Sequence, residues 1–119
     1  MRKSFFPSFL ILLMLACFNT VVATAQEVSK HDKLIVKGNR LIVKKKYNEA
    51  LDAYDEATKL KSDSFIGWYN KGIVLNLLSR YEDAVVALNQ AVKIEPNNHQ
   101  AWFVKGNASQ KKRRPAPSK

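Results

Sequence analysis

Apolar residues recur at helical spacings twice within each stretch of 34 residues. In residues 65–98 the first half carries Trp68, Leu75 and Leu78 at such spacings, and the second half carries an i, i+3, i+4, i+7 stripe. That stripe consists of Tyr81, Ala84, Val85, Leu88, Ala91 and Val92. Residues 31–64 repeat it with Tyr47, Ala50, Leu51, Tyr54, Ala57 and Thr58. The pattern predicts two helices in each stretch and an all-α fold.

Turn-forming residues separate the predicted helices. The segments "KSDS" (61–64) and "EPNN" (95–98) each close one helix and offer Ser64 and Asn98 as N-caps of the next. Each 34-residue stretch is therefore expected to be a helical hairpin. Over residues 26–110 we expect about five helices, which form two complete hairpins and one terminal helix.

The two stretches are copies of one unit. Laying residues 31–64 over 65–98 without a gap pairs eight identical residues, whereas ordinary composition would pair roughly two by chance. The identical pairs include Lys37/Lys71, Gly38/Gly72, Tyr47/Tyr81, Ala50/Ala84 and Ala57/Ala91. A third copy begins at His99 and carries Trp102, Lys105 and Gly106 at the matching positions. A fixed period of this size predicts a solenoid of helix–turn–helix repeats, here about two and a half of them.

Glycine stands in the middle of each predicted first helix, at Gly38, Gly72 and Gly106. Glycine costs about 1 kcal/mol relative to alanine inside a helix, so its recurrence needs a compensating reason. We expect the second helix of each repeat to approach the first closely at this point. For the lysine before each glycine, the expectation is an aliphatic stem along the helix surface with its ammonium group in water.

These residues resemble the tetratricopeptide repeat, a helix–turn–helix unit of 34 residues. The matching residues of the second copy are Trp68, Gly72, Leu75, Tyr81, Ala84, Leu88, Ala91 and Pro96. Lys71 departs from the leucine most common in the family, and in the first copy Leu34 and Ser62 replace the tryptophan and the proline. The resemblance covers residues 31–110 and implies repeats at 31–64 and 65–98, followed by the first helix of an incomplete repeat at 99–110.

The resemblance also implies protein–protein recognition, with successive first helices lining a concave groove that receives a partner segment. The groove positions carried over are Ile35, Asn39, Ile42, Tyr69, Asn70, Ile73, Asn76, Phe103 and Asn107. Asparagine can bond a peptide backbone or a carboxylate, and aromatic rings offer stacking area. Some family members clamp a partner's terminal carboxylate with two asparagines and several cations. Asn39 and Asn70 fit that clamp, but Ile35, Gln100 and Val104 stand at its cationic positions, which argues against it.

Residues 1–25 have the three parts of a secretory signal peptide. Two cations precede a nearly uninterrupted apolar stretch from Phe5 to Val22, and "ATA" at 23–25 follows, which predicts cleavage after Ala25. Two alternatives stay open: an uncleaved membrane anchor, because about 18 apolar residues can just span a bilayer, and lipid attachment at Cys17. Cys17 is the chain's single cysteine, so no disulfide forms within the chain.

Basic residues collect at the end of the chain rather than over its body. The formal net charge is +10, but residues 26–110 hold 13 Lys/Arg against 10 Asp/Glu, while "KKRRPAPSK" (111–119) holds five cations. After a short linker at 26–30 and the repeats, we expect residues 111–119 to form a basic disordered tail, because Pro115 and Pro117 cannot continue a helix. Binding of nucleic acid or an acidic surface through this tail is the alternative function. Truncation or a frameshift of a longer repeat protein would also explain the incomplete third copy.

Nothing in residues 26–119 has the pattern of a catalytic or cofactor site. There is no glycine-rich phosphate loop, nucleophile elbow or metal-ligand spacing, and the histidines His31 and His99 lie two repeats apart. We therefore expect a non-catalytic scaffold or adaptor without cofactor or metal, exported or membrane-anchored. Its expected partner is a protein or peptide rather than nucleic acid. Membrane contact through an uncleaved N-terminal segment and self-association are left open.

Overall fold

The computed structural model describes residues 11–14, 16 and 28–114. Most of the predicted signal peptide and residues 115–119 lie outside the described residues. Residues 11–14 and 16 are helical, with the side chains of Ile11, Leu12, Leu13 and Met14 exposed. Among the described residues, no helix combines the length and the apolar content needed to cross a membrane.

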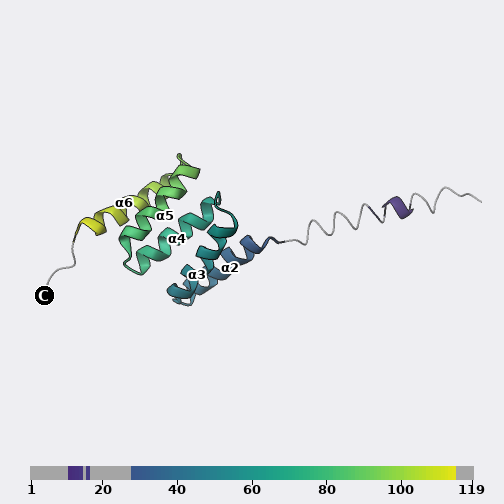
Figure 1. Ribbon diagram of the computed structural model, residues 1–119, viewed down its shortest axis with the longest axis horizontal. Helices are drawn as coiled ribbons and strands as arrows, with labels where there is room; N and C mark the ends of the chain where they lie inside the picture. The colour runs from purple at the N-terminus through teal and green to yellow at the C-terminus, as the bar shows by residue number, and fades with distance from the viewer. Residues whose placement is uncertain (1–10, 15, 17–27, 115–119) are drawn as a thin grey trace, which may run out of the picture.

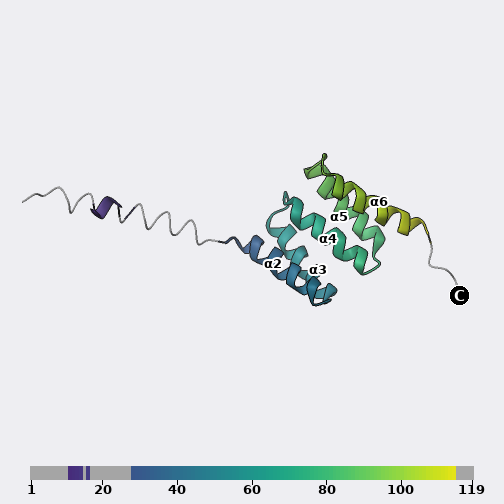
Figure 2. The same cartoon turned by 180° about the vertical axis from the view of Figure 1, so that it is seen from behind.

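Helices α2 to α6 form the body of the molecule and follow one another as a row of antiparallel neighbours (Figure 1). Their bounds are α2 Lys30–Val43, α3 Tyr47–Leu60, α4 Phe65–Leu77, α5 Tyr81–Ile94 and α6 His99–Arg113. The hairpin α2–α3 lies at one end of the row and α6 at the other, as the view from behind also shows (Figure 2). The predicted all-α solenoid, with two hairpins and one further helix, is confirmed.

The turns and caps repeat with the same period. Lys45 and Ser79, 34 residues apart, both adopt a left-handed φ of 59° in the short turn inside each hairpin. The side chains of Ser64 and Asn98 accept hydrogen bonds from the backbone N–H of Gly67 and Ala101, which confirms both predicted N-caps. Helix α2 begins at Lys30, inside the expected linker 26–30, because Ser29 caps it in the same way.

The core is built from the predicted apolar stripes. Alanines of the second helices are fully buried, and the largest fully buried side chains are Tyr54, Leu75, Leu88 and Val74. The small alanines let neighbouring helices approach, while the few large side chains fill the space between them. The body therefore has one continuous core running through both hairpins.

The repeated glycines have two different environments. A Cβ built on Gly38 would lie 2.5 Å from Tyr54 Cε1, and one on Gly72 would lie 2.5 Å from Leu88 Cγ. The expected close approach of the second helix is therefore confirmed in the two complete repeats. A Cβ built on Gly106 would meet no atom within 4 Å apart from its chain neighbours and its own helix backbone, because no second helix packs against α6 there among the described residues.

The expected tail boundary at residue 111 is wrong by three residues. Helix α6 continues through Lys111, Lys112 and Arg113, where cations in the last turn are favourable beside the helix carbonyl groups. Arg114 is extended, with φ −98° and ψ 102°, as expected for a residue that precedes proline. The Nζ atom of Lys111 lies 5.6 Å from the ring centroid of Tyr81, so part of the expected tail packs against α5.

Candidate functional site

The first helices of the repeats form the inner side of the row. Within the described residues, α4 contacts both α2 and α6, whereas the second helices α3 and α5 do not contact each other. Helices that touch lie on the inside of a curve and helices that separate lie on the outside. The curvature therefore places the inner surface on α2, α4 and α6, as the repeat pattern implies.

Asn39 and Asn70 meet on this inner surface. Asn39 Oδ1 accepts a hydrogen bond from the Tyr54 hydroxyl at 2.6 Å and a second from Asn70 Nδ2 at 3.2 Å. Burial raises the pKa of Tyr54 to about 12, so its phenol stays protonated and donates at neutral pH. These two bonds join α2, α3 and α4 and orient the Asn39 amide. Among the described residues, Asn39 Nδ2 and Asn70 Oδ1 form no hydrogen bond.

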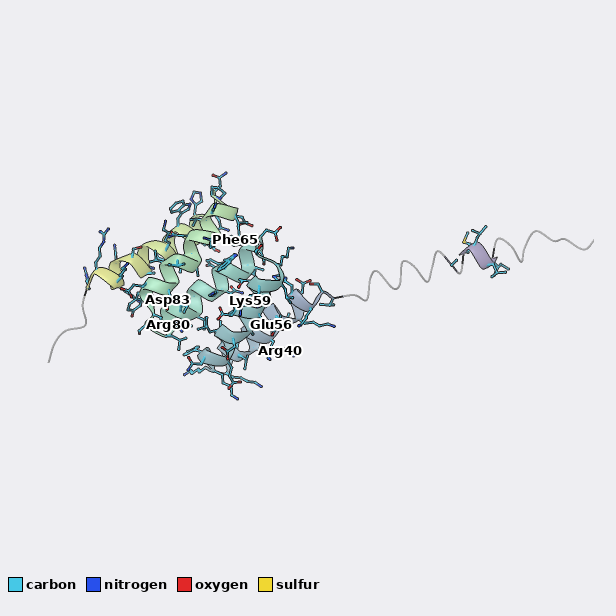
Figure 3. The ribbon with its side chains drawn as sticks, in the orientation of Figure 1. Arg40, Glu56, Lys59, Phe65, Arg80 and Asp83 are labelled. Atoms are coloured by element: carbon cyan, nitrogen blue, oxygen red, sulfur yellow. The ribbon has the colours of Figure 1, made fainter. Side chains whose placement is uncertain are left out.

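Aromatic side chains lie on the same helices. Tyr69 stacks on Phe65 with ring centroids 5.4 Å apart and an interplanar angle of 14°. Phe65, the first residue of α4 and labelled in Figure 3, was not among the residues predicted from the sequence. Phe103 on α6 is 69% exposed, so its ring is available to a partner. Stacked and exposed rings of this kind are common anchors of binding surfaces.

The remaining predicted groove residues differ in accessibility. Asn107 is exposed, and Ile73 is partly buried. Ile42 is partly buried and packs against the core. Asn76 is also partly buried, and its Oδ1 atom has no hydrogen-bond partner in the described structure. Ile35 is only 8% exposed and belongs to the core, so it offers little surface to a partner.

The recurring lysine has a more specific environment than the sequence predicted. Lys71 Nζ lies 2.8 Å from Asp55 Oδ1 and 5.1 Å from the ring centroid of Trp68. Lys105 repeats the cation–π contact at 4.6 Å from Trp102. The signal was present as a tryptophan and a lysine three residues apart, which share a helix face. Leu34 interrupts this pattern in the first copy.

Lys71 borders a hollow of about 230 Å³ on the outer side, between α3 and α5. Arg80 and Asp83, which lie side by side in Figure 3, form an ion pair of 2.7 Å at its edge. Its charged groups are already paired with one another, so this hollow offers few unsatisfied groups to a ligand.

Neither described histidine belongs to a cluster of potential metal ligands. His31 is buried, and its Nε2 atom is hydrogen-bonded with Ser64 Oγ at 2.8 Å, which links α2 to the cap of α4. No group of three or more potential ligand side chains occurs in the described part of the chain. His31 therefore has a structural role in the junction of the two hairpins.

Comparison with known proteins agrees with this geometry. A family model described as "Tetratricopeptide repeat" matches residues 65–98, and a second described as "TPR repeat" matches residues 38–78. No curated protein matches the chain. Among solved structures, the chain is similar to the TPR2B domain of yeast Sti1 in complex with pHsp70, with a TM-score of 0.66 and 25% sequence identity.

The similarity to the yeast domain covers 68% of this chain and 65% of the other. The chain thus spans just under two thirds of the length of that neighbour. The two family models together extend over residues 38–98, which include most of α2 and all of α3, α4 and α5. Tetratricopeptide repeats are therefore found in residues 38–98 of this chain.

Proposed function

We propose that this chain is a non-catalytic interaction module that binds an extended segment of a partner protein along the inner surface of α2, α4 and α6. The observation that carries the proposal is the double hydrogen bond to Asn39 Oδ1. It leaves an amide donor on Asn39 and an amide acceptor on Asn70. A peptide group offers one acceptor and one donor, so it can pair with both.

The chemistry of the surface favours an internal, largely uncharged segment over a free C-terminus. A carboxylate binds best where cations or several donors converge. Ile35, Gln100 and Val104 occupy the positions at which a terminal-carboxylate clamp has its cations, and Ile35 is buried. Tyr69 on α4 and Phe103 on α6 supply aromatic area for apolar side chains of the segment. The peptide complex of the similar yeast domain supports a peptide partner in general.

The test uses a partner captured by pull-down and reduced to its binding peptide. The variant Asn70→Ala with Phe103→Ala should weaken binding about tenfold or more, because the energy of an interface is concentrated in a few central residues. Phe103 is highly exposed, so its loss leaves the core intact. Asn89→Ala, at an exposed position of the second helix α5, is the matched control and should leave binding unchanged. Amidating the peptide's C-terminus should also have little effect.

The alternative function, binding through the basic C-terminal residues, makes opposite predictions. Deleting residues 111–119 would abolish binding, and affinity would fall steeply with added salt. Loss of binding on this deletion, with the Asn70 and Phe103 variant unaffected, would refute the inner-surface proposal.

We further propose that the chain works outside the cytoplasm or at a membrane, on the basis of the tripartite pattern of residues 1–25.

A further inference from the structure

One face of α2, continued by the C-cap residue Lys44, carries four cations in one line. Lys33, Lys37, Arg40 and Lys44 follow one another at steps of four, three and four residues, which places them on one side of a helix. All four are exposed, and none of them forms an ion pair within residues 28–114. We call these four residues the basic stripe. Glu56, one of the four acidic residues on the adjacent helix α3, is already paired with Lys30 at 2.9 Å.

The basic stripe occupies the face that packs against a neighbouring hairpin in the other repeats. The same positions in α4 are Gly67, Lys71, Val74 and Leu78, and those in α6 are Ala101, Lys105, Ala108 and Lys112. Val74, Ala101 and Ala108 are fully buried there. A helix packed on α2 as closely as α3 packs on α4 would bury Lys33 and Arg40, at a high cost in desolvation. This face is therefore suited to a charged surface rather than to another repeat.

Apolar side chains lie beside the cations. Val28 is 53% exposed and Val36 is 47% exposed, and together with the stripe they line a shallow hollow of about 490 Å³. A helix face that combines cations with exposed apolar side chains is typical of segments that lie on anionic membrane surfaces. In Figure 3, Arg40 is labelled on the α2–α3 hairpin, at the end of the row away from α6.

The position of the stripe along the chain favours a bilayer over an acidic protein. The apolar stretch Phe5–Val22 ends eight residues before Lys30, the first residue of α2. Eight residues reach at most about 29 Å when fully extended. Where the apolar stretch stays uncleaved in a membrane, this short connection keeps the start of α2, and with it the stripe, close to the membrane surface. Cations so placed are attracted to anionic headgroups.

We propose that the basic stripe docks the repeat body onto a bilayer containing anionic phospholipids. Asn39 is one residue from Arg40 and lies about 100° around the helix from it, so docking leaves the inner surface open. The proposal does not depend on the inner-surface function, since the stripe and the inner surface use different faces of α2.

The experiment compares two kinds of vesicle, one of phosphatidylcholine alone and one in which phosphatidylglycerol replaces about one third of the lipid. The full chain is synthesised in a cell-free system with each vesicle, and bound protein is separated by flotation. The ratio of the two partition coefficients isolates the contribution of charge, because the apolar N-terminal stretch meets a hydrocarbon core in both cases. Each stripe cation should contribute about fivefold to this ratio, and the four together several hundredfold.

Charge-matched variants separate the stripe from net charge. The stripe variant combines Lys33→Gln, Lys37→Gln, Arg40→Gln and Lys44→Gln. It should lose most of the preference for anionic vesicles. The control replaces the exposed residues Lys59, Lys61, Lys93 and Lys112 by Gln and should keep the preference within a few-fold. Replacing the three stripe lysines by Arg should keep it as well, which guards against a folding defect at these positions.

Three results would overturn the proposal. The unmodified chain could bind both vesicles equally, or the stripe and control variants could lose the preference together. The stripe variant could also keep its vesicle preference while losing binding to soluble polyglutamate, in which case the stripe serves an acidic protein.

Discussion

The recurring glycine of the first helix can be replaced by alanine in each of the three copies. Two of these variants should lose stability and the third should gain it. Gly38, Gly72 and Gly106 are equivalent by sequence, but their surroundings differ. A Cβ on Gly38 would meet the rigid ring of Tyr54 at 2.5 and 2.6 Å, and one on Gly72 would meet the branched end of Leu88 at 2.5 and 2.8 Å. A Cβ on Gly106 would meet nothing within 4 Å.

Two opposing contributions set the magnitude. Alanine is favoured over glycine inside a helix by about 1 kcal/mol, and this gain applies to all three variants. Forcing an extra carbon into a packed core typically costs about 1–3 kcal/mol. Tyr54 cannot retreat without losing its hydrogen bond to Asn39, whereas the Leu88 side chain can rotate. We therefore expect Gly38→Ala to lose about 2 kcal/mol, Gly72→Ala about 1 kcal/mol, and Gly106→Ala to gain up to about 1 kcal/mol.

Thermal unfolding followed by circular dichroism measures these differences. A change of 1 kcal/mol shifts the midpoint of a domain this size by about 4–8 °C, so the three variants should be well separated. Urea titration of the same variants gives the free energy of unfolding and shows whether the transition stays cooperative. If Gly106→Ala lost as much stability as Gly38→Ala, or if Gly38→Ala gained stability, the close packing of second helices on the glycines would be refuted.

Other measurements test neighbouring parts of the structure. The pKa of Tyr54 is higher in the folded chain than in the unfolded chain, so the free energy of unfolding should fall as the pH rises from about 10 to 12. Unfolding curves at alkaline pH should show a smaller fall for Tyr54→Phe than for the control variant Tyr47→Phe. Ser64→Ala removes a helix cap and the partner of buried His31, and urea titration should show a loss of about 2–3 kcal/mol. The exported chain should begin near Gln26 by intact mass, and an uncleaved terminus in soluble cytoplasm would contradict export.

The repeat made the fold predictable, because each helix, cap and turn occurs at least twice at a fixed spacing. A single N-cap signal is weak, but Ser64 and Asn98 at the same repeat position support one another. The exact end of α6 was harder to predict. A run of cations such as Lys111, Lys112 and Arg113 occurs both in basic tails and in the last turn of helices. The sequence alone limits the helix only through the proline at 115.

The site was less predictable than the fold. The repeat period predicts which helix positions face the inner surface, but it does not predict which side chains those positions contact. Ile35 and Tyr69 share one repeat position, yet Ile35 is buried in the terminal hairpin and Tyr69 stacks on Phe65. The hydrogen bond from Tyr54 to Asn39 depends on a tyrosine where the next repeat has Leu88. The basic stripe could not be recognised from the net charge, because the charge of the whole body is nearly balanced. Only the helical spacing of its four cations shows that they share one face.

The central claim is that the inner surface of α2, α4 and α6 receives a partner segment. Nuclear magnetic resonance of the isotope-labelled chain, titrated with the binding peptide, tests it most directly. The side-chain amide signals of Asn39 and Asn70 and the ring signals of Tyr69 and Phe103 should shift together and saturate at one peptide per chain. Shifts confined to Lys111, Lys112 and Arg113, with the Asn39 and Asn70 signals unchanged, would contradict the account.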